Sequence, residues 1–200
     1  MESKEVVKKQ IANLTSNILN PFLVSVAIIM LLSFASVSSP LDALRWSLIA
    51  IGLSVLPIFV VMVYLVRKGS LDTILTNARG QRTKIYVLSG ICAALGIILL
   101  NYLQAPSLLV AAFITGVSTA VIFMCINVWW KISLHTACVA ASVTVLVMLH
   151  GWTATATVAL VPLTAWARVE SKDHSLAQAT TGALLAALIA VVVFYPFIKV

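Results

Sequence analysis

Long apolar runs restrict this chain to one kind of fold. Six runs approach the ~20 residues that an α-helix needs to cross a hydrocarbon core, and they lie at about 22–39, 46–66, 85–103, 108–129, 132–150 and 175–197. Hydrophobic residues make up 62% of the chain, charged residues make up 10%, and the mean hydropathy is +1.09. These values are typical of membrane proteins. We therefore expect an all-α, polytopic bundle of transmembrane helices.

A seventh apolar run, at about 153–167, is too short to cross a bilayer comfortably on its own. Tilt, local thinning and packed neighbours relax the length requirement inside a polytopic chain, so we count this run as a span. The chain is then a single integral membrane domain, residues 1–200, with about seven spans. The alternative is a cleaved signal peptide at the N-terminus, which leaves six spans. We favour a retained helix because the first run is longer than the apolar core of a usual signal peptide.

Basic residues are divided unequally between the two faces that seven spans create. One face carries eleven Lys and Arg residues and the other carries two. The opposite face holds Arg45 and Lys199, and the basic face holds Lys4, Lys8, Lys9, Arg67, Lys68, Arg79, Arg82, Lys84, Lys131, Arg168 and Lys172. Because cytoplasmic loops are enriched in Lys and Arg, we predict that the basic face is cytoplasmic. The pI of about 9.6 reflects this bias, and we expect no nucleic-acid partner.

Three polar clusters share the basic face. They are residues 77–84, residues 131–136 with His135, and the link from Arg168 to His174. Each has an ordinary interpretation, because basic loops contact anionic headgroups and interfacial histidines are often simply hydrogen-bonded. If the clusters meet, two imidazoles and up to three guanidiniums surround one point. That combination supplies a nucleophile, a proton donor and fixed positive charge, which are the groups that phosphoryl transfer uses.

The three clusters resemble the signatures of the type 2 phosphatidic acid phosphatase superfamily. The third signature, Arg-x5-His-x3-Asp with a later Gly, resembles the spacing of Arg168, His174, Gln178 and Gly182. The second, Pro-Ser-Gly-His-Thr, resembles residues 133–136, and the basic first signature resembles Arg79 and Arg82. The resemblance covers about residues 67–190 and implies a six-helix phosphatase-like core.

The resemblance implies a metal-independent phosphatase that acts on a lipid phosphate or a polyprenyl diphosphate. In this family His174 would attack phosphorus and become a phosphohistidine, and His135 would protonate the leaving oxygen. The residues expected to hold the phosphoryl oxygens are Arg79, Arg82, Arg168 and Ser133. We expect no cofactor and no metal, because the sequence has no phosphate-binding glycine loop, nucleotide fingerprint or Cys/His cluster. The sequence does not predict an oligomeric state.

The sequence departs from the family signatures at several positions. Gln178 replaces the Asp that orients the nucleophilic histidine; an amide can accept a ring N–H and fix the tautomer, but it brings no charge to an imidazolium. The other departures are Leu75, Thr83, Ile132 and Leu134. Two further functions stay open. One is a catalytically weakened protein that binds lipid phosphates, and the other is a small transporter, although we find no inverted repeat and no ionisable residue deep within a span.

Overall fold

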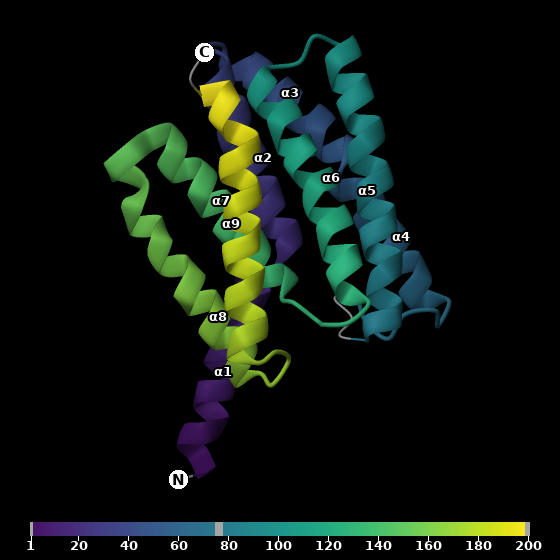
Figure 1. Cartoon of the computed structure of the whole chain (residues 1–200), viewed down its shortest axis with the longest axis vertical. Coiled ribbons are helices and arrows are strands. Elements are labelled where there is room, and N and C mark those ends of the chain that lie inside the picture. Colours follow the sequence, from purple (N-terminus) through teal and green to yellow (C-terminus); the bar gives the residue numbers. More distant parts are fainter. Residues whose placement is uncertain (1, 75–77, 199–200) are drawn as a thin grey trace. The chain divides into compact units, whose positions relative to one another are not determined.

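The computed structural model describes residues 2–74 and 78–198, without the side chains of Glu2, Ser3 and Arg79. Figure 1 shows that this part of the chain consists of helices joined by short links. The elements are α1 (Glu2–Ile18), α2 (Pro21–Ser36), α3 (Pro40–Leu53), α4 (Val55–Arg67), α5 (Arg79–Tyr102), α6 (Ser107–Asn127), α7 (Leu134–His150), the 3-10 helix η1 (Gly151–Ala159), α8 (Leu160–Glu170) and α9 (Leu176–Ile198). The prediction of an all-α fold is confirmed.

The chain divides into two compact units. The first unit comprises residues 1–25 and 131–198, and the second comprises residues 26–130. Each unit packs helices of its own. The single domain expected over residues 1–200 therefore stays a prediction.

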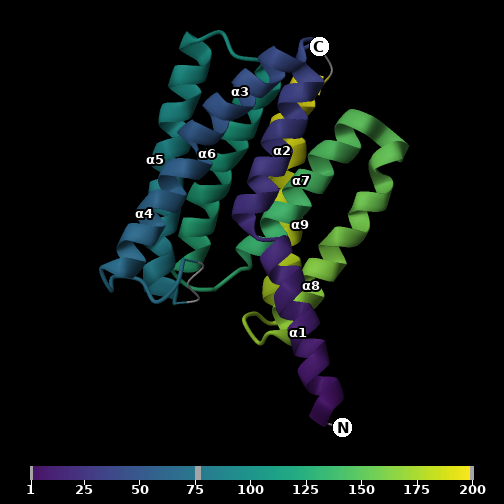
Figure 2. The same cartoon turned by 180° about the vertical axis from the view of Figure 1, so that it is seen from behind.

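The second unit contains the hairpin of α5 and α6, which is its most extensive packing and runs antiparallel (Figures 1 and 2). The hairpin returns the end of α6 to the start of α5, where Asn127 Nδ2 donates to Thr83 Oγ1 over 3.4 Å. Lys84 Nζ donates to the Ser70 carbonyl over 3.3 Å and ties the start of α5 to the preceding link. The α4–α5 link and the end of α6 thus share one end of the hairpin.

Proline explains why the predicted run at 46–66 forms two helices, α3 and α4. The break falls at Ser54, which has φ −119° and ψ −74°. Proline lacks an N–H, and its ring clashes with the carbonyl four residues earlier; for Pro57 that carbonyl belongs to Leu53, the last residue of α3. Pro162 acts in the same way on Val158, which lies in η1 just before regular α-helix begins.

The first unit is built around α7 and α9, which form its most extensive packing. After η1 makes the turn, α8 runs back along α7 (Figures 1 and 2). α1 packs against α8 and was not predicted, because its charged residues were interpreted as an N-terminal tail. Ala12 and Ser16 lie on its buried face, while Val7, Ile11 and Leu14 are exposed.

The helices support a multi-pass membrane protein, with fewer qualifying spans than the seven predicted. Five segments of the described chain are long and apolar enough to cross a membrane, or six if α1 and α2 form one bent span. They are Pro40–Arg67, Gly80–Tyr102, Ser107–Asn127, Leu134–Glu170 and Leu176–Ile198. The difference arises because α2 alone has only 16 residues, and because α8, with 11 residues, belongs to a segment that also contains α7 and η1.

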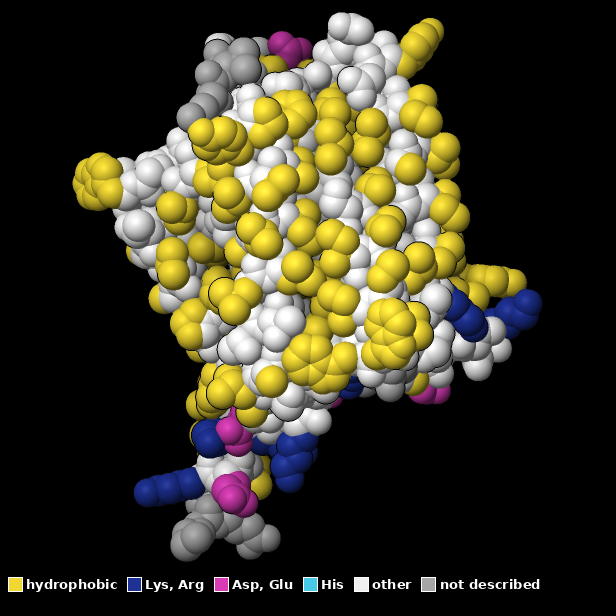
Figure 3. Space-filling view, in the orientation of Figure 1, with side chains coloured by type: hydrophobic (Ala, Val, Ile, Leu, Met, Phe, Trp, Pro, Cys, Tyr) yellow, Lys and Arg dark blue, Asp and Glu magenta, His cyan; other side chains and the backbone are white. Residues whose placement is uncertain are grey.

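Hydrophobic side chains cover most of the surface seen in Figure 3, whereas the visible charged side chains gather toward the ends of the helices. Large exposed residues such as Ile98, Leu184 and Val192 are 65%, 73% and 65% accessible. A soluble monomer rarely exposes continuous apolar surface of this kind. The surface is therefore suited to contact with lipid chains.

Candidate functional site

The turn between α8 and α9 brings His174 back onto Arg168. Lys172 adopts the left-handed conformation, with φ 59°, as is usual for the residue that follows a helix end in a Schellman motif. The Lys172 N–H donates to the Val169 carbonyl, and the N–H groups of Asp173 and His174 both donate to the Arg168 carbonyl over 3.2 Å. The residues that separate Arg168 from His174 in the sequence thus form a closed turn.

A capping box begins α9 and fixes the His174 ring. The Gln178 N–H donates to Ser175 Oγ over 3.2 Å, and the Ser175 N–H donates to Gln178 Oε1 over 3.1 Å, which is the reciprocal pattern of Ser-x-x-Gln. Because a backbone N–H can only donate, this bond identifies the oxygen of the amide. The same Oε1 lies 3.2 Å from His174 Nδ1. In the neutral ring, Nδ1 therefore carries the proton and Nε2 carries the lone pair.

The start of α7 packs directly beside this capping box. Ser133 caps α7, since its Oγ accepts the Thr136 N–H over 3.4 Å. The Ser133 N–H donates to the Gln178 carbonyl over 3.2 Å, and the Thr136 hydroxyl donates to the Ala179 carbonyl over 2.9 Å. His135 lies between these two anchored residues and is 5% exposed. The first turns of α7 and α9 are thereby joined around buried polar groups.

Gly182 allows this close approach of the two helices. A methyl group at Gly182 would lie 2.7 Å from the Ser133 carbonyl oxygen and 3.3 Å from the Ser133 nitrogen. Both are backbone atoms, so they cannot swing aside as the end of a long side chain can. The glycine that matches the third signature thus has a packing role at the start of α7.

Arg168 is the buried cation of the cluster, with 7% exposure. Its Nη2 lies 2.9 Å from Asp173 Oδ2, and its Nη1 donates to Ser16 Oγ on α1 over 2.6 Å. Lys131 adds a second cation, because its Nζ donates to the Asp173 carbonyl over 2.7 Å. Of these two cations, Arg168 pairs with the Asp173 carboxylate, whereas Lys131 contacts the backbone carbonyl of Asp173. This end of the first unit is therefore suited to an anionic group.

The first unit gathers five of the seven predicted site residues, namely His174, His135, Gln178, Arg168 and Ser133. The other two belong to the second unit. Arg82 is 2% exposed on α5, and its guanidinium carbon lies 5.8 Å from the centre of the Tyr86 ring. Arg79 begins α5, but its side chain lies outside the described part of the chain, as does Leu75. The second and third signatures meet in one unit, and the part played by the first stays a prediction.

Three residues that shape the site, Ser175, Asp173 and Ser16, were not predicted from the sequence. The Ser-x-x-Gln pattern at Ser175 was visible in the sequence and predicts a capping box. Asp173 was assigned no function from the sequence, whereas it pairs with Arg168. Ser16 gave no signal, because it lies 152 residues from the guanidinium that it contacts.

The helices are those of a multi-pass membrane protein, and its first unit holds a buried cluster of His135, His174 and Arg168. Among the described residues, no group of three or more His, Cys, Asp or Glu side chains could hold a metal ion. No family model, curated protein or solved structure matches the chain.

Proposed function

We propose that this protein is an integral membrane phosphatase that hydrolyses a lipid phosphate or a polyprenyl diphosphate through a phosphohistidine at His174. The observation that carries the proposal is the bond between His174 Nδ1 and Gln178 Oε1 at 3.2 Å. Because it fixes the tautomer, Nε2 holds a directed lone pair, as a nucleophile requires. The resemblance to the phosphatidic acid phosphatase signatures supports the same assignment.

The proposed reaction has two steps. His174 Nε2 attacks phosphorus, the bond from phosphorus to the leaving oxygen breaks, and His135 gives a proton to that oxygen. The leaving oxygen is the ester oxygen of a lipid phosphate or the bridging oxygen of a diphosphate. Water then attacks the phosphohistidine with His135 as the base, the P–N bond breaks, and inorganic phosphate leaves. Arg168 and Ser133 hold the phosphoryl oxygens as negative charge develops on them.

The location of the cluster favours a substrate that is embedded in a membrane. His135 and His174 lie at the starts of α7 and α9, and both helices belong to apolar segments long enough to span a bilayer. Helix ends of this kind lie at the depth of the polar headgroups. A lipid phosphate can reach the cluster from the leaflet while its chains stay among the neighbouring lipids.

A second candidate function is binding of lipid phosphates without hydrolysis. Gln178 gives no negative charge to stabilise an imidazolium, and the Arg168 guanidinium already pairs with Asp173 over 2.9 Å. Both features weaken catalysis while leaving a net-positive cluster. We rank this function below hydrolysis, since the fixed tautomer has no evident use in a protein that only binds.

Phosphate release by the detergent-solubilised protein tests the proposal. The substrates are a short-chain phosphatidate and a short-chain prenyl diphosphate, each with and without EDTA, and release should be unaffected by EDTA. His174→Ala should abolish release. His150→Ala is the matched control, because His150 is exposed at the opposite end of α7, and it should keep wild-type activity.

The outcomes separate the two candidates. Release by His174→Ala within a few-fold of the wild-type rate would remove His174 from the mechanism. Saturable binding of the phosphatidate without release, lost in Arg168→Gln, would support the binding protein instead. A radiolabelled phosphoryl group that is acid-labile, alkali-stable and absent from His174→Ala would identify the intermediate.

A further inference from the structure

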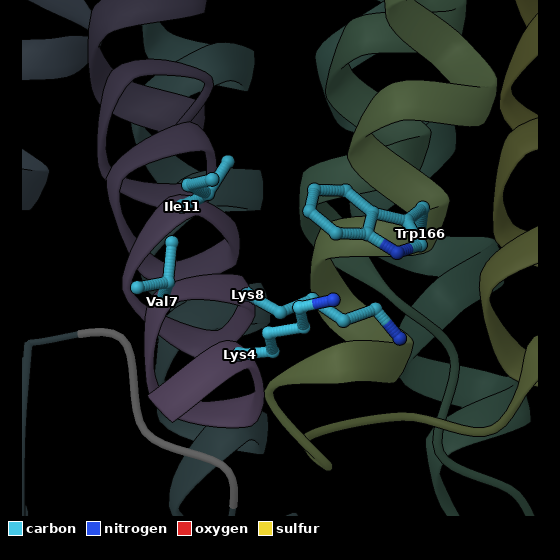
Figure 4. A pocket seen from close by; sticks show the side chains of 5 residues that line it. All are labelled: Lys4, Val7, Lys8, Ile11 and Trp166. Carbon is cyan, nitrogen blue, oxygen red and sulfur yellow. The ribbon is translucent and has the colours of Figure 1, made fainter. Parts of the chain in front are cut away.

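An open groove lies between α1 and α8, and its lining includes none of the residues of the histidine cluster. Its volume is about 330 Å³, and it is lined by Lys4, Val7, Lys8, Ile11 and Trp166. Four of these residues come from one face of α1, because they recur every three or four positions. Figure 4 shows the two lysine side chains extending from α1 toward α8, on the side where the indole ring of Trp166 lies, with Val7 and Ile11 next to them on α1.

The lining of the groove is cationic in one part and apolar in the other. Lys4 and Lys8 supply ammonium groups, whereas Val7, Ile11 and Trp166 supply aliphatic and aromatic surface. Lys8 Nζ also pairs with Glu170 over 2.6 Å, but the side chains of this pair are 56% and 25% exposed. An exposed ion pair contributes little, so a phosphate can replace the Glu170 carboxylate at Lys8.

The apolar stripe of α1 indicates which kind of molecule occupies this groove. Val7, Ile11, Leu14 and Ile18 follow one another at helical spacing and are 52%, 51%, 61% and 58% exposed. Ala12 and Ser16, on another side of the helix, are buried, and Ser16 accepts a hydrogen bond from Arg168 on α8. A basic helix with one exposed apolar face lies in the membrane interface, where tryptophan is also enriched.

We propose that the groove between α1 and α8 binds an anionic phospholipid of the surrounding leaflet. Its phosphate contacts Lys4 and Lys8, and the first carbons of an acyl chain pack on Ile11 and Trp166. The site is independent of the proposed phosphatase reaction, since it uses none of the histidine cluster. It is connected to that cluster through α1, however, because Ser16 on the same helix accepts a hydrogen bond from Arg168. A bound lipid therefore stabilises α1 against α8 and, through Ser16, the position of the guanidinium.

Fluorescence quenching by brominated lipids tests the proposal on the full chain in nanodiscs. In a variant whose other four tryptophans are replaced by Phe, brominated phosphatidylglycerol should quench Trp166 more strongly than brominated phosphatidylcholine at equal mole fraction. One lysine near an anionic surface contributes about fivefold to lipid preference. The preference should therefore fall by roughly that factor in Lys4→Gln or Lys8→Gln, and it should vanish in the double variant.

Lys9→Gln is the matched control, because it removes the same charge from the same helix without changing the lining of the groove. It should leave the preference unchanged. Equal quenching of Trp166 by the two lipids in the single-tryptophan variant would overturn the proposal. So would a loss of lipid preference in Lys9→Gln as large as that in Lys4→Gln or Lys8→Gln.

A second measurement keeps the test valid if the single-tryptophan variant does not fold. Native mass spectrometry of the protein with all its tryptophans should detect a retained anionic phospholipid that is lost in Lys4→Gln/Lys8→Gln and kept in Lys9→Gln. The same lipid should be retained by His174→Ala, which separates this site from the proposed reaction. Equal retention by the wild type and the double lysine variant would refute the site.

Discussion

Replacing Gly182 with alanine tests the packing that holds the candidate site together. The new methyl group would lie 2.7 Å from the Ser133 carbonyl oxygen, so the starts of α7 and α9 have to separate by several tenths of an ångström. That movement stretches the bond from the Ser133 N–H to the Gln178 carbonyl, which is already 3.2 Å long. The substitution therefore disturbs both Ser133, which caps α7, and Gln178, whose side chain fixes the tautomer of His174.

Two opposing terms decide the magnitude. Overpacking a close contact costs about 1–3 kcal/mol, whereas alanine in place of glycine inside a helix stabilises by about 1 kcal/mol. The net effect on the free energy of unfolding is a loss of about 1 kcal/mol, the middle of a range of about 0–2 kcal/mol. For a chain of 200 residues, 1 kcal/mol corresponds to a change in Tm of roughly 2–4 °C. Gly182→Ala should thus lower Tm by a few degrees, and phosphate release should fall by ~10- to 100-fold because small displacements of reacting groups are costly.

Gly90→Ala provides the control for this experiment. A methyl group at Gly90 on α5 would lie 3.8 Å from Ala120 Cβ, which is ordinary contact, so only the gain in helix propensity remains. Thermal unfolding in detergent, followed by tryptophan fluorescence, measures both variants. Gly182→Ala should melt below the wild type, and Gly90→Ala at or slightly above it. If Gly182→Ala melts at or above the temperature of the wild type, as Gly90→Ala should, the close approach of α9 to Ser133 is refuted.

Three further predictions concern the charge at position 178, the ion pair of Arg168 with Asp173, and the side of the membrane on which each loop lies. Gln178→Glu keeps the length needed for the bonds to Ser175 and His174 and adds a negative charge beside the imidazole. The rate of phosphate release should therefore rise, and it should rise in Gln178→Asp as well. If the wild type and both variants release no phosphate, the protein binds lipid phosphates without hydrolysing them. Asp173→Asn removes the carboxylate that competes for Arg168, whose side chain is only 9% exposed. Orthovanadate should therefore inhibit this variant at lower concentration than the wild type, and unchanged inhibition would indicate that Arg168 does not bind the phosphoryl group. The last prediction uses single cysteines in a background without the native ones. Ser70→Cys and Ser171→Cys should react with an impermeant thiol reagent from the cytoplasmic side, and Ser39→Cys only from the opposite side. If positions 70 and 171 react from opposite sides, the number of spans between them is wrong.

Several features of the fold could be predicted from the sequence because they depend on neighbouring residues only. An apolar run of about twenty residues needs no partner elsewhere in the chain to favour a membrane helix, and the all-α class follows from such runs. The same holds for the break before Pro57, since the clash with the Leu53 carbonyl is local. The capping box at Ser175 could have been predicted as well, because its two residues are three positions apart.

The spacing of the third signature was informative for a reason that only the structure reveals. Arg168 and His174 are brought together by a Schellman turn in which Lys172 has φ 59°, and a lysine gives little indication that this conformation is adopted. The sequence therefore predicted the pair but not the turn that joins it. It also assigned Asp173 no function, although that carboxylate lies 2.9 Å from the guanidinium.

Contacts between distant parts of the chain were decided by tertiary structure alone. The charged N-terminal stretch has the composition of a tail, yet it forms α1, because packing on α8 buries Ala12 and Ser16 while the exposed apolar stripe remains on the other side. Ser16 meets Arg168 across 152 residues, and no local pattern encodes such a pair. The sequence by itself determined which segments are helices suited to a membrane, because that property is summed along each segment. Which polar groups surround His174 was decided by helix packing, because hydrogen bonds depend on distances of about 3 Å that sequence spacing does not specify.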